Sequence, residues 1–352
     1  MAKVLVVGLG QMGEAVAWAL QTLGCTVYGL DKKWNRVIDC KRKYGILESN
    51  SSHTGGDFVL NENIDLVFSC LPYTMTANLA TVCRNKNIFY ADLGGNPATS
   101  KQIYASFKGA WKVCFTDLGL TPGLINIMAE HVMKKQKPRQ LTLRVGGLPQ
   151  TRTNSLGYTL TWSIAGLWNE YIGMCDMVLN GQKIEYKALG YIDQINHDHW
   201  NMESSPTKGG LAHTLESAIK NGLELAKYET IRYKGHFEKI IFLLNECKLR
   251  NNFDLFEKII SKACPPTKND KVLLQIETES SKITTSVFAT DWTAMQRCTA
   301  FPAAVVAYQM INGEFDGIDI CHYEHVPIAR FSSLLSTFLS ESFFDLGEEN
   351  YE

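Results

Sequence analysis

The first 120 residues alternate short apolar runs with segments whose apolar residues recur at helical spacing. The apolar runs predict strands at residues 4–7, 26–30, 66–69, 88–92 and 113–115. The helical spacing predicts helices at residues 12–23, 34–44, 75–84 and 100–108. Strands that alternate with helices are typical of a doubly wound parallel sheet. The pattern therefore predicts an α/β fold that begins with a Rossmann domain.

The pattern changes near residue 119, where Thr121-Pro122-Gly123 opens a helix that runs to about residue 135. Strands predicted at 141–146, 183–189, 272–279 and 282–291 form a second, antiparallel sheet, with helices at 166–178, 236–245 and 254–263. An apolar helix at 294–313 returns to the first domain. We expect a Rossmann domain over residues 1–122, an inserted α+β substrate-binding and dimerisation domain over 123–293, and a C-terminal helical segment over 294–352.

A glycine-rich turn joins the first predicted strand to the first predicted helix. The turn reads Gly8-x-Gly10-x-x-Gly13, and its predicted cofactor-binding residues are Gly8, Gly10, Gln11, Met12 and Gly13. The first glycine permits a tight turn, the second lets a pyrophosphate approach the backbone, and the third lets helix and strand pack closely. Because the turn lies between a strand and a helix, it predicts a dinucleotide site at the helix N-terminus.

The end of the second predicted strand bears on the choice of cofactor. Asp31 lies at the distance expected for a carboxylate that accepts hydrogen bonds from the adenosine ribose, which favours NAD. Lys32, Lys33 and Arg36 follow, and they offer an alternative in which a cation holds the 2′-phosphate of NADP. We therefore predict NAD as the cofactor, with Lys32 beside it, and NADP is not excluded.

Two other strand ends are expected at the same edge of the sheet, where ligands of such folds bind. The first is Cys70-Leu71-Pro72-Tyr73, and the second includes Leu93 and Gly94. We predict that Cys70, Leu71, Pro72, Leu93 and Gly94 contact the cofactor and that Tyr73 contacts the substrate.

Composition narrows the class of protein. The 352 residues are 45% hydrophobic and 20% charged, with a formal net charge of −1, so neither nucleic acid nor a membrane surface is an expected partner. The first predicted strand starts at residue 3 and no apolar run approaches the length of a membrane span, so we expect a cytoplasmic protein. The ten cysteines form no C-x-x-C pair and are expected to be reduced, and no metal site is expected.

The chain resembles the saccharopine dehydrogenase-like oxidoreductases, and within them most of all the L-lysine 6-dehydrogenases. The resemblance is carried, in the family's order, by Gly8–Gly13, Cys70–Tyr73, Gly119–Leu124, Gly146–Pro149, Asn154–Ser163, Gly209–Leu211, Thr230–His236, and Arg297 with Phe301-Pro302. It implies oxidation of a C–N bond with hydride transfer to a nicotinamide. For lysine, the ε-carbon loses the hydride and the imine is hydrolysed to a semialdehyde.

Three features bear on the branch of the family. Saccharopine-forming members tend to carry an arginine just after the Trp-Ser pair, whereas Trp162-Ser163 is followed here by Ile164-Ala165-Gly166. The Arg232-Tyr233-x-Gly235-His236 run is similar to the lysine dehydrogenase form. Thr121 stands where the family usually has an acidic residue, and its hydroxyl is still able to cap the following helix.

The resemblance also implies roles for single residues. It places Tyr158, Trp162 and Ser163 in the wall of the substrate pocket. Arg232 and Arg297 are the candidate partners of the substrate α-carboxylate, because arginine binds a carboxylate with two parallel hydrogen bonds. An ammonium with a pKa near 10.4 must lose a proton before hydride leaves, which calls for a general base. The candidate catalytic bases are Asp92, Asp117 and His236.

Two alternatives to lysine oxidation stay open at this point. One is reductive coupling of an amine with a semialdehyde, as in saccharopine and carboxynorspermidine enzymes. The other is a non-catalytic regulator that binds NAD(H). In each case the resemblance implies a homodimer or a larger homo-oligomer, and the dehydrogenase alternatives imply a small amino-acid or amine substrate.

Overall fold

The computed structural model describes residues 1–54, 57–61, 63–197, 200–340 and 349–350. The chain divides into two compact units. Unit 1 comprises residues 1–127 and 296–340, and unit 2 comprises residues 128–295 together with a strand at 349–350. Residues 341–348 and 351–352 of the predicted C-terminal segment lie outside the described residues. Within the described part of the chain, no helix combines the length and the apolar character that crossing a bilayer requires.

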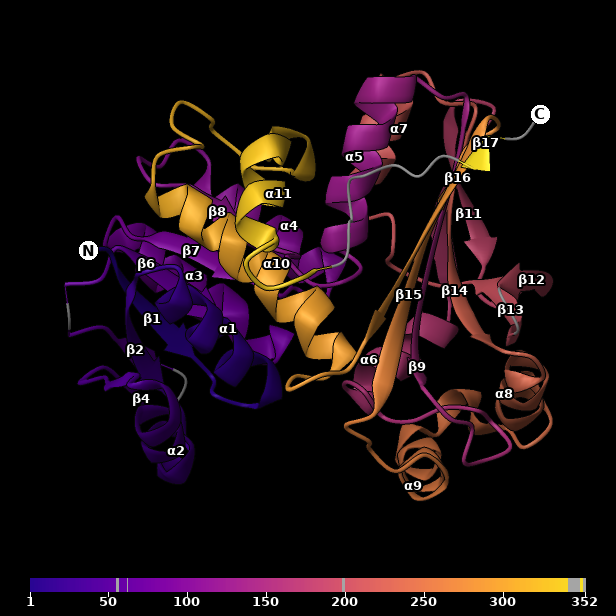
Figure 1. Cartoon of the computed structure of the whole chain (residues 1–352), viewed down its shortest axis with the longest axis horizontal. Coiled ribbons are helices and arrows are strands. Elements are labelled where there is room, and N and C mark those ends of the chain that lie inside the picture. Colours follow the sequence, from indigo (N-terminus) through magenta and orange to yellow (C-terminus); the bar gives the residue numbers. More distant parts are fainter. Residues whose placement is uncertain (55–56, 62, 198–199, 341–348, 351–352) are drawn as a thin grey trace. The chain divides into compact units, whose positions relative to one another are not determined.

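Unit 1 is built on a six-stranded parallel sheet (Figure 1). Its strands are β1 (Lys3–Val7), β2 (Thr26–Leu30), β3 (Leu47–Glu48), β6 (Leu66–Ser69), β7 (Phe89–Asp92) and β8 (Cys114–Phe115). They lie in the order β3-β2-β1-β6-β7-β8. Strands β4 (Ser52–Thr54) and β5 (Asp57–Val59) form a separate hairpin. Counted without that hairpin, the order is 3-2-1-4-5-6, that of a doubly wound dinucleotide-binding domain. The predicted Rossmann fold is confirmed.

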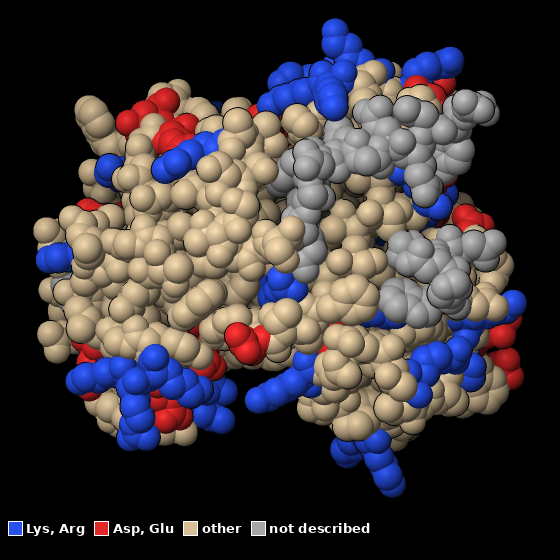
Figure 2. Space-filling view, viewed as in Figure 1, with Lys and Arg blue, Asp and Glu red and all other residues tan. Residues whose placement is uncertain are grey.

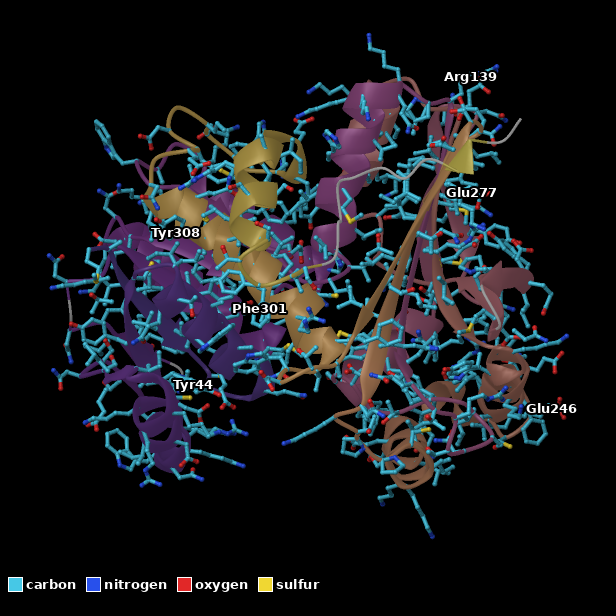
Figure 3. All side chains as sticks on the ribbon, viewed as in Figure 1. Tyr44, Arg139, Glu246, Glu277, Phe301 and Tyr308 are labelled. Carbon is cyan, nitrogen blue, oxygen red and sulfur yellow. The ribbon has the colours of Figure 1, made fainter. Side chains whose placement is uncertain are left out.

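The helices of unit 1 cover this sheet. They are α1 (Gln11–Thr22), α2 (Trp34–Tyr44), α3 (Tyr73–Asn85), α4 (Pro97–Phe107), α10 (Ala294–Ile311), η2 (Tyr323–His325) and α11 (Ile328–Leu335). Helix α10 packs on α1, because the ring of Phe301 (labelled in Figure 3) lies 5.2 Å from that of Trp18 and 5.1 Å from that of Phe338. The predicted helical return to the first domain is therefore confirmed.

Unit 2 is built on a nine-stranded sheet. Its strands are β9 (Gln140–Pro149), β10 (Met174–Leu179), β11 (Gln182–Lys187), β12 (Asp193–His197), β13 (Trp200–Pro206), β14 (Leu225–Tyr233), β15 (Asp270–Glu277), β16 (Ser281–Phe288) and β17 (Glu349–Asn350). The main order is β11-β10-β14-β9-β15-β16-β17, and β13 pairs with both β12 and β14. The predicted hairpin of the last two long strands is β15 and β16.

Three sequence predictions for unit 2 need correction. The sheet is mixed, not antiparallel, because β9 and β14 pair in parallel. The predicted helix at 166–178 is wrong beyond residue 171, since Met174–Leu179 is strand β10. Strand β14 was not predicted at all, although it contains Arg232 and pairs with three other strands.

The helices of unit 2 are α5 (Leu124–Gln136), which begins in unit 1, α6 (Ile164–Tyr171), α7 (Thr214–Lys220), α8 (His236–Asn245), η1 (Leu249–Asn251) and α9 (Phe253–Ala263). Helices α6, α8 and α9 bury one apolar cluster that includes Leu167, Phe237 and Phe256. This cluster also contains Tyr158 and Tyr171, so the core of unit 2 fixes both tyrosines near β14.

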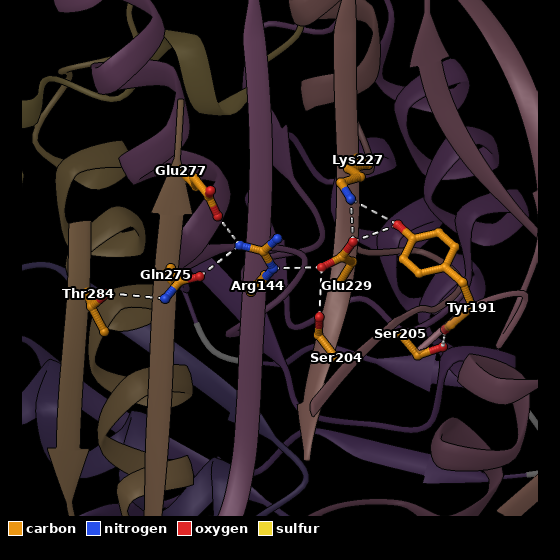
Figure 4. A network of polar contacts seen from close by, with 9 residues as sticks. All are labelled: Arg144, Tyr191, Ser204, Ser205, Lys227, Glu229, Gln275, Glu277 and Thr284. Carbon is orange, nitrogen blue, oxygen red and sulfur yellow. Dashed lines mark hydrogen bonds and ion pairs between the residues drawn. The ribbon is translucent and has the colours of Figure 1, made fainter. Parts of the chain in front are cut away.

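A network of polar side chains links four neighbouring strands on one face of this sheet (Figure 4). Arg144 of β9 donates to Glu229 of β14 at 2.6 Å and contacts Glu277 of β15. The Glu229 carboxylate also accepts hydrogen bonds from Lys227 and Tyr191, both at 2.6 Å, and from a serine of β13. Burial alone would raise the pKa of Glu229, but Arg144 and Lys227 lower it to about 2. Glu229 is therefore an ionised side chain that ties β9, β13 and β14 together.

We predict that Glu229→Gln lowers the free energy of unfolding by about 3 kcal/mol at neutral pH, because it removes the carboxylate that Arg144 and Lys227 share and leaves Arg144 with Glu277 alone. The depressed pKa gives the carboxylate a stabilising contribution that is present above the ordinary value of 4.5 and is lost as pH falls through about 2. Urea unfolding of wild type and variant between neutral pH and pH about 3 should therefore show a gap that narrows with acid. Asp176→Asn, which removes an exposed ion pair with Lys183, is the control and should change stability far less. A gap that stays constant with pH would contradict the assignment.

Candidate functional site

The glycine turn between β1 and α1 has the geometry that a dinucleotide site needs. Gly8 has a φ of +92°, and a Cβ there would lie 2.9 Å from the carbonyl oxygen of Cys70. A Cβ on Gly13 would lie 1.8 Å from the carbonyl oxygen of Gly8, so no other residue fits there without moving the turn. Gly10 caps α1 without a side-chain hydrogen bond, and a Cβ there would meet only Arg36, at 3.7 Å. The N-terminus of α1, with Gln11 and Met12, is thus open to an anion.

The Asp31 carboxylate fastens this turn to the end of β2. It accepts hydrogen bonds from the backbone N–H groups of Leu9 and Lys33, each at 2.7 Å. Arg36 of α2 lies 3.2 Å from the same carboxylate, whereas Lys32 is exposed. Figure 2 shows Lys and Arg side chains gathered over α2, whose sequence holds four of them. The residues predicted to favour NAD and NADP therefore lie side by side.

The other predicted cofactor residues lie at the ends of β6 and β7. Cys70 donates its backbone N–H to Val7 at 2.8 Å, and Leu71 would contact a Cβ on Gly8. Pro72 caps α3, and Tyr73 begins that helix. Leu93 and Gly94 follow β7, and Gly94 has a φ of +75°. The end of β6 therefore meets the glycine turn through Cys70 and Leu71.

Two buried carboxylates, predicted as candidate bases, lie at the same edge of the unit 1 sheet. Asp92 accepts four hydrogen bonds, from the Tyr90 and Thr116 hydroxyls and from the backbone N–H groups of Gly94 and Asp117. Burial raises its pKa despite these donors. The number of donors indicates that Asp92 holds the loop after β7 in place.

Asp117 differs from Asp92 in backbone and environment. It has a φ of +63°, and its carboxylate accepts from the Ser100 hydroxyl at 2.9 Å and from the backbone N–H of Gly95. Burial, and then the charge of Asp92, raise its pKa to about 7. Asp117 can therefore exchange a proton near neutral pH, which a general base requires.

Thr121 does not cap the helix that follows it, contrary to the expectation above. Its buried hydroxyl has no hydrogen-bond partner among the described residues. The side chain of Asn126 accepts the Gly123 N–H instead, at 2.9 Å.

Arg297, the second predicted carboxylate partner, lies on α10 in unit 1 and is buried, with 5% of its surface exposed. Its neighbour Gln296 donates to the backbone carbonyl of Gln11 in the glycine turn.

In unit 2, Arg232 is buried and heads a directed chain of hydrogen bonds. Its Nε donates to the Tyr171 hydroxyl at 3.0 Å, so that hydroxyl donates its own hydrogen to Nε2 of His236, also 3.0 Å away. Nδ1 of His236 lies 2.9 Å from the carbonyl oxygen of Leu156 and must carry the other hydrogen, because a carbonyl only accepts. Both His236 nitrogens are thus engaged. Burial and the charge of Arg232 lower the pKa of His236 to about 3, which favours a structural role over that of a base.

Arg232 lies among groups that stabilise its charge. Burial alone would lower its pKa, but Tyr171 and Glu170 raise it above the ordinary value. The guanidinium lies 5.0 Å from the ring centre of Tyr158 and 5.9 Å from that of Tyr171, within range of cation–π attraction. Its terminal Nη2 lies 3.6 Å from the Glu170 carboxylate, beyond hydrogen-bond length. Arg232 is therefore held in its cationic form.

The three predicted pocket-wall residues have different surroundings. Tyr158 is buried, which raises its pKa to about 12, and the side chains of Thr161 and Trp162 lie beside its hydroxyl. Ser163 caps α6 by accepting from the Gly166 N–H at 3.3 Å. Trp162 is 42% exposed, and its ring lies so close to Gly166 that a Cβ there would approach it to 2.1 Å.

Comparison with known proteins identifies the family of the chain. Residues 119–336, more than half of its length, match the family model described as the saccharopine dehydrogenase C-terminal domain. The chain belongs to the saccharopine dehydrogenase family. Bovine mitochondrial alpha-aminoadipic semialdehyde synthase is 27% identical over 253 residues, which cover 66% of this chain. The match spans only 27% of that relative's length.

Solved structures share the fold. An apo saccharopine dehydrogenase (L-Glu forming) of Saccharomyces cerevisiae superposes with a TM-score of 0.76 at 13% identity, covering 97% of this chain and 98% of the yeast chain. A homospermidine synthase of Legionella pneumophila, crystallised in complex with NAD, gives a TM-score of 0.70 at 12% identity, covering 96% and 90%. At these identities the likeness concerns the fold of this family member.

The structure brings the predicted residues of this saccharopine dehydrogenase family member together in two groups. The cofactor candidates, Asp92, Asp117, Tyr73 and Arg297 belong to unit 1, whereas Tyr158, Trp162, Ser163, Arg232 and His236 belong to unit 2. Glu170 of α6 was not predicted from the sequence as a site residue. The one sequence signal for it is that it is the single acidic residue of an otherwise uncharged helix, Ile164–Tyr171. Among the described residues, no group of three or more His, Cys, Asp or Glu side chains could hold a metal ion.

The raised pKa of Asp117 predicts a pH-dependent stability. Its contribution is fully present below the ordinary value of 3.8 and is lost as pH rises through about 7. Asp117→Asn mimics the protonated carboxyl and suits a positive φ. We expect the variant to gain about 2–3 kcal/mol relative to wild type between pH about 5 and 8. Denaturant unfolding of the wild type and the variant at these two pH values measures the difference in the free energy of unfolding. A difference that does not change between the two pH values would contradict the prediction.

Proposed function

We propose that this protein is an NAD-dependent dehydrogenase that oxidises the C–N bond of an amino acid, with the ε-carbon of L-lysine as the site of oxidation. The observation that carries the proposal is the buried guanidinium of Arg232. Among the described residues, its Nη2 group makes only a long ion pair with Glu170, whereas Nε and Nη1 each donate a hydrogen bond. Donors left over in a buried site call for an anion, and the α-carboxylate of an amino acid supplies one.

The residues of unit 1 fit a dinucleotide. The backbone of Gly8 to Gly13 would hold the pyrophosphate at the N-terminus of α1, and Asp31 would accept from the adenosine ribose. When bound, NAD supplies the acceptor for the hydride. NADP is the alternative cofactor, and Arg36 is the residue placed to hold its 2′-phosphate.

The substrate amine must lose a proton before its carbon can release a hydride. At pH 7 about one ε-amine in 2,500 is neutral, which corresponds to roughly 4–5 kcal/mol. Asp117 is our candidate for the group that takes this proton, because its pKa is raised to about 7. With its lone pair free, the neutral amine would be able to expel the hydride that bound NAD accepts, and hydrolysis of the resulting iminium would give the semialdehyde and ammonium.

Lysine is preferred over a saccharopine-type substrate for a reason of charge. A substrate with additional carboxylates needs a further cation, and Ile164-Ala165-Gly166 supplies none after Trp162-Ser163. Each missing charge-assisted hydrogen bond weakens binding by roughly 1.5–3 kcal/mol.

The test of the proposed function is the initial rate of absorbance change at about 340 nm with purified protein and NAD. Lysine, ornithine and saccharopine are compared at pH about 9–10, where the amine is partly neutral. We expect NADH formation with lysine. NADH formation with saccharopine alone would move the assignment to the coupling branch, and binding of NADH with no turnover of any amine would point to a regulator.

Asp117→Asn should lower kcat for lysine by about 10²–10⁴-fold, because the amide cannot accept the amine proton. KM should change little, since Asp117 is not assigned to the carboxylate site. Glu48→Gln, which breaks an exposed ion pair with Lys41 in the same unit, is the matched control and should retain wild-type rates. A variant that keeps its kcat would remove Asp117 from the role of base.

A further inference from the structure

Glu170 presents a carboxylate of which only one oxygen is satisfied. Oε1 accepts hydrogen bonds from the hydroxyls of Thr207 and Thr230. Oε2 is buried and accepts no hydrogen bond from any described residue. Its nearest charged neighbour is Arg232, whose Nη2 lies 3.6 Å away. Because a buried carboxylate oxygen without a donor is costly, this geometry calls for a donor from outside the described chain.

The surroundings of Glu170 specify the charge of that donor. The side chain is 11% exposed and that of Arg232 is 4% exposed, so both charges are held largely away from water. The buried hydroxyls of Tyr158 and Thr161 lie beside each other in the same part of unit 2. The cluster thus leaves an anionic acceptor, Oε2 of Glu170, without a donor beside the cationic guanidinium of Arg232. A ligand that satisfies both must carry a cation beside an anion.

An α-amino acid carries those two charges on one carbon atom. We propose that Glu170 receives the α-ammonium of the substrate while Arg232 receives its α-carboxylate, so that unit 2 selects α-amino acids and rejects simple amines and simple acids. The inference rests on the proposed function for its choice of substrate, and it assigns to Glu170 the recognition of the head group. The ε-amine of lysine is chemically distinct from this head group and stays available for oxidation.

If Glu170 had only a structural role, its substitution would change ligand binding in a different way. As a mere counter-ion, Glu170 would position Arg232, and its loss would weaken all carboxylate ligands equally. As a receptor of the ammonium, its loss would weaken only ligands that carry an α-amino group. L-norleucine and hexanoate differ by that group alone, and neither carries an ε-amine that could react.

The experiment is titration calorimetry of the full-length protein, saturated with NADH, against L-norleucine, hexanoate and n-hexylamine. Glu170→Gln keeps an oxygen for the Thr207 and Thr230 hydroxyls but removes the charge. We expect it to weaken L-norleucine binding about tenfold or more and to leave hexanoate within about twofold. Glu170→Asp, which keeps the charge, should restore part of the loss. Asp176→Asn, an exposed carboxylate of the same unit, is the control and should bind as wild type does.

Equal losses for L-norleucine and hexanoate, or wild-type binding of hexanoate that matches L-norleucine, would overturn the inference. Thermal unfolding of Glu170→Gln shows whether the variant folds, and NADH binding reports on unit 1. If the variant does not fold, wild-type protein alone decides the matter, because the inference requires L-norleucine to bind at least tenfold more tightly than hexanoate or n-hexylamine. If L-norleucine binds through Glu170 but lysine is not oxidised, the proposed reaction fails and the head-group site stands.

Discussion

A guanidinium that is taken out of water loses its hydration, and the protein must replace that hydration with fixed partners. Arg232 shows how unit 2 meets this requirement. Tyr171 and a backbone carbonyl accept two of its N–H groups, the Tyr158 ring lies within cation–π range, and Glu170 supplies the opposite charge. His236 in turn fixes the orientation of the Tyr171 hydroxyl. The packing of α6 and α8 against β14 therefore depends on the burial of one charge.

Strand β14 carries this charge on one face and a second ionic cluster on the other. Side chains alternate along a strand, so Arg232 and Thr230 lie opposite Lys227 and Glu229. Glu229 accepts four hydrogen bonds and stays ionised, whereas Glu170, the partner of Arg232, has one oxygen without a donor among the described residues. The Glu229 cluster is complete in itself and holds the sheet. The cluster of Arg232 and Glu170 is incomplete, which is the property expected of a binding site.

These two faces also explain what the sequence could and could not predict. The Rossmann unit could be predicted because β1 is a continuous apolar run and the turn after it consists of consecutive residues, Gly8 to Gly13. Strand β14 was missed because charged residues occupy both of its faces and hide the apolar alternation. The hairpin strand β10 was read as helix because Gly173, not a long loop, separates it from α6. The local sequence pattern was sufficient where neighbouring residues determine the secondary structure of a segment. It failed where pairing with a distant strand determines that structure.

The candidate site residues likewise differ in whether local sequence could predict them. Asp31 and the glycines lie close together around one turn, so their proximity could be predicted from spacing. Glu170 lies far in sequence from Arg232, and no spacing rule relates a carboxylate on α6 to a guanidinium on β14. Equally, a sequence cannot distinguish Asp92 from Asp117, since Asp92 ends one buried strand and Asp117 follows another. The structure separates them by their hydrogen bonds: four donors commit Asp92 to its loop, while Asp117 has a pKa near neutrality and a strained backbone. Because perturbed pKa values cluster at functional sites, we propose Asp117 and not Asp92 as the base.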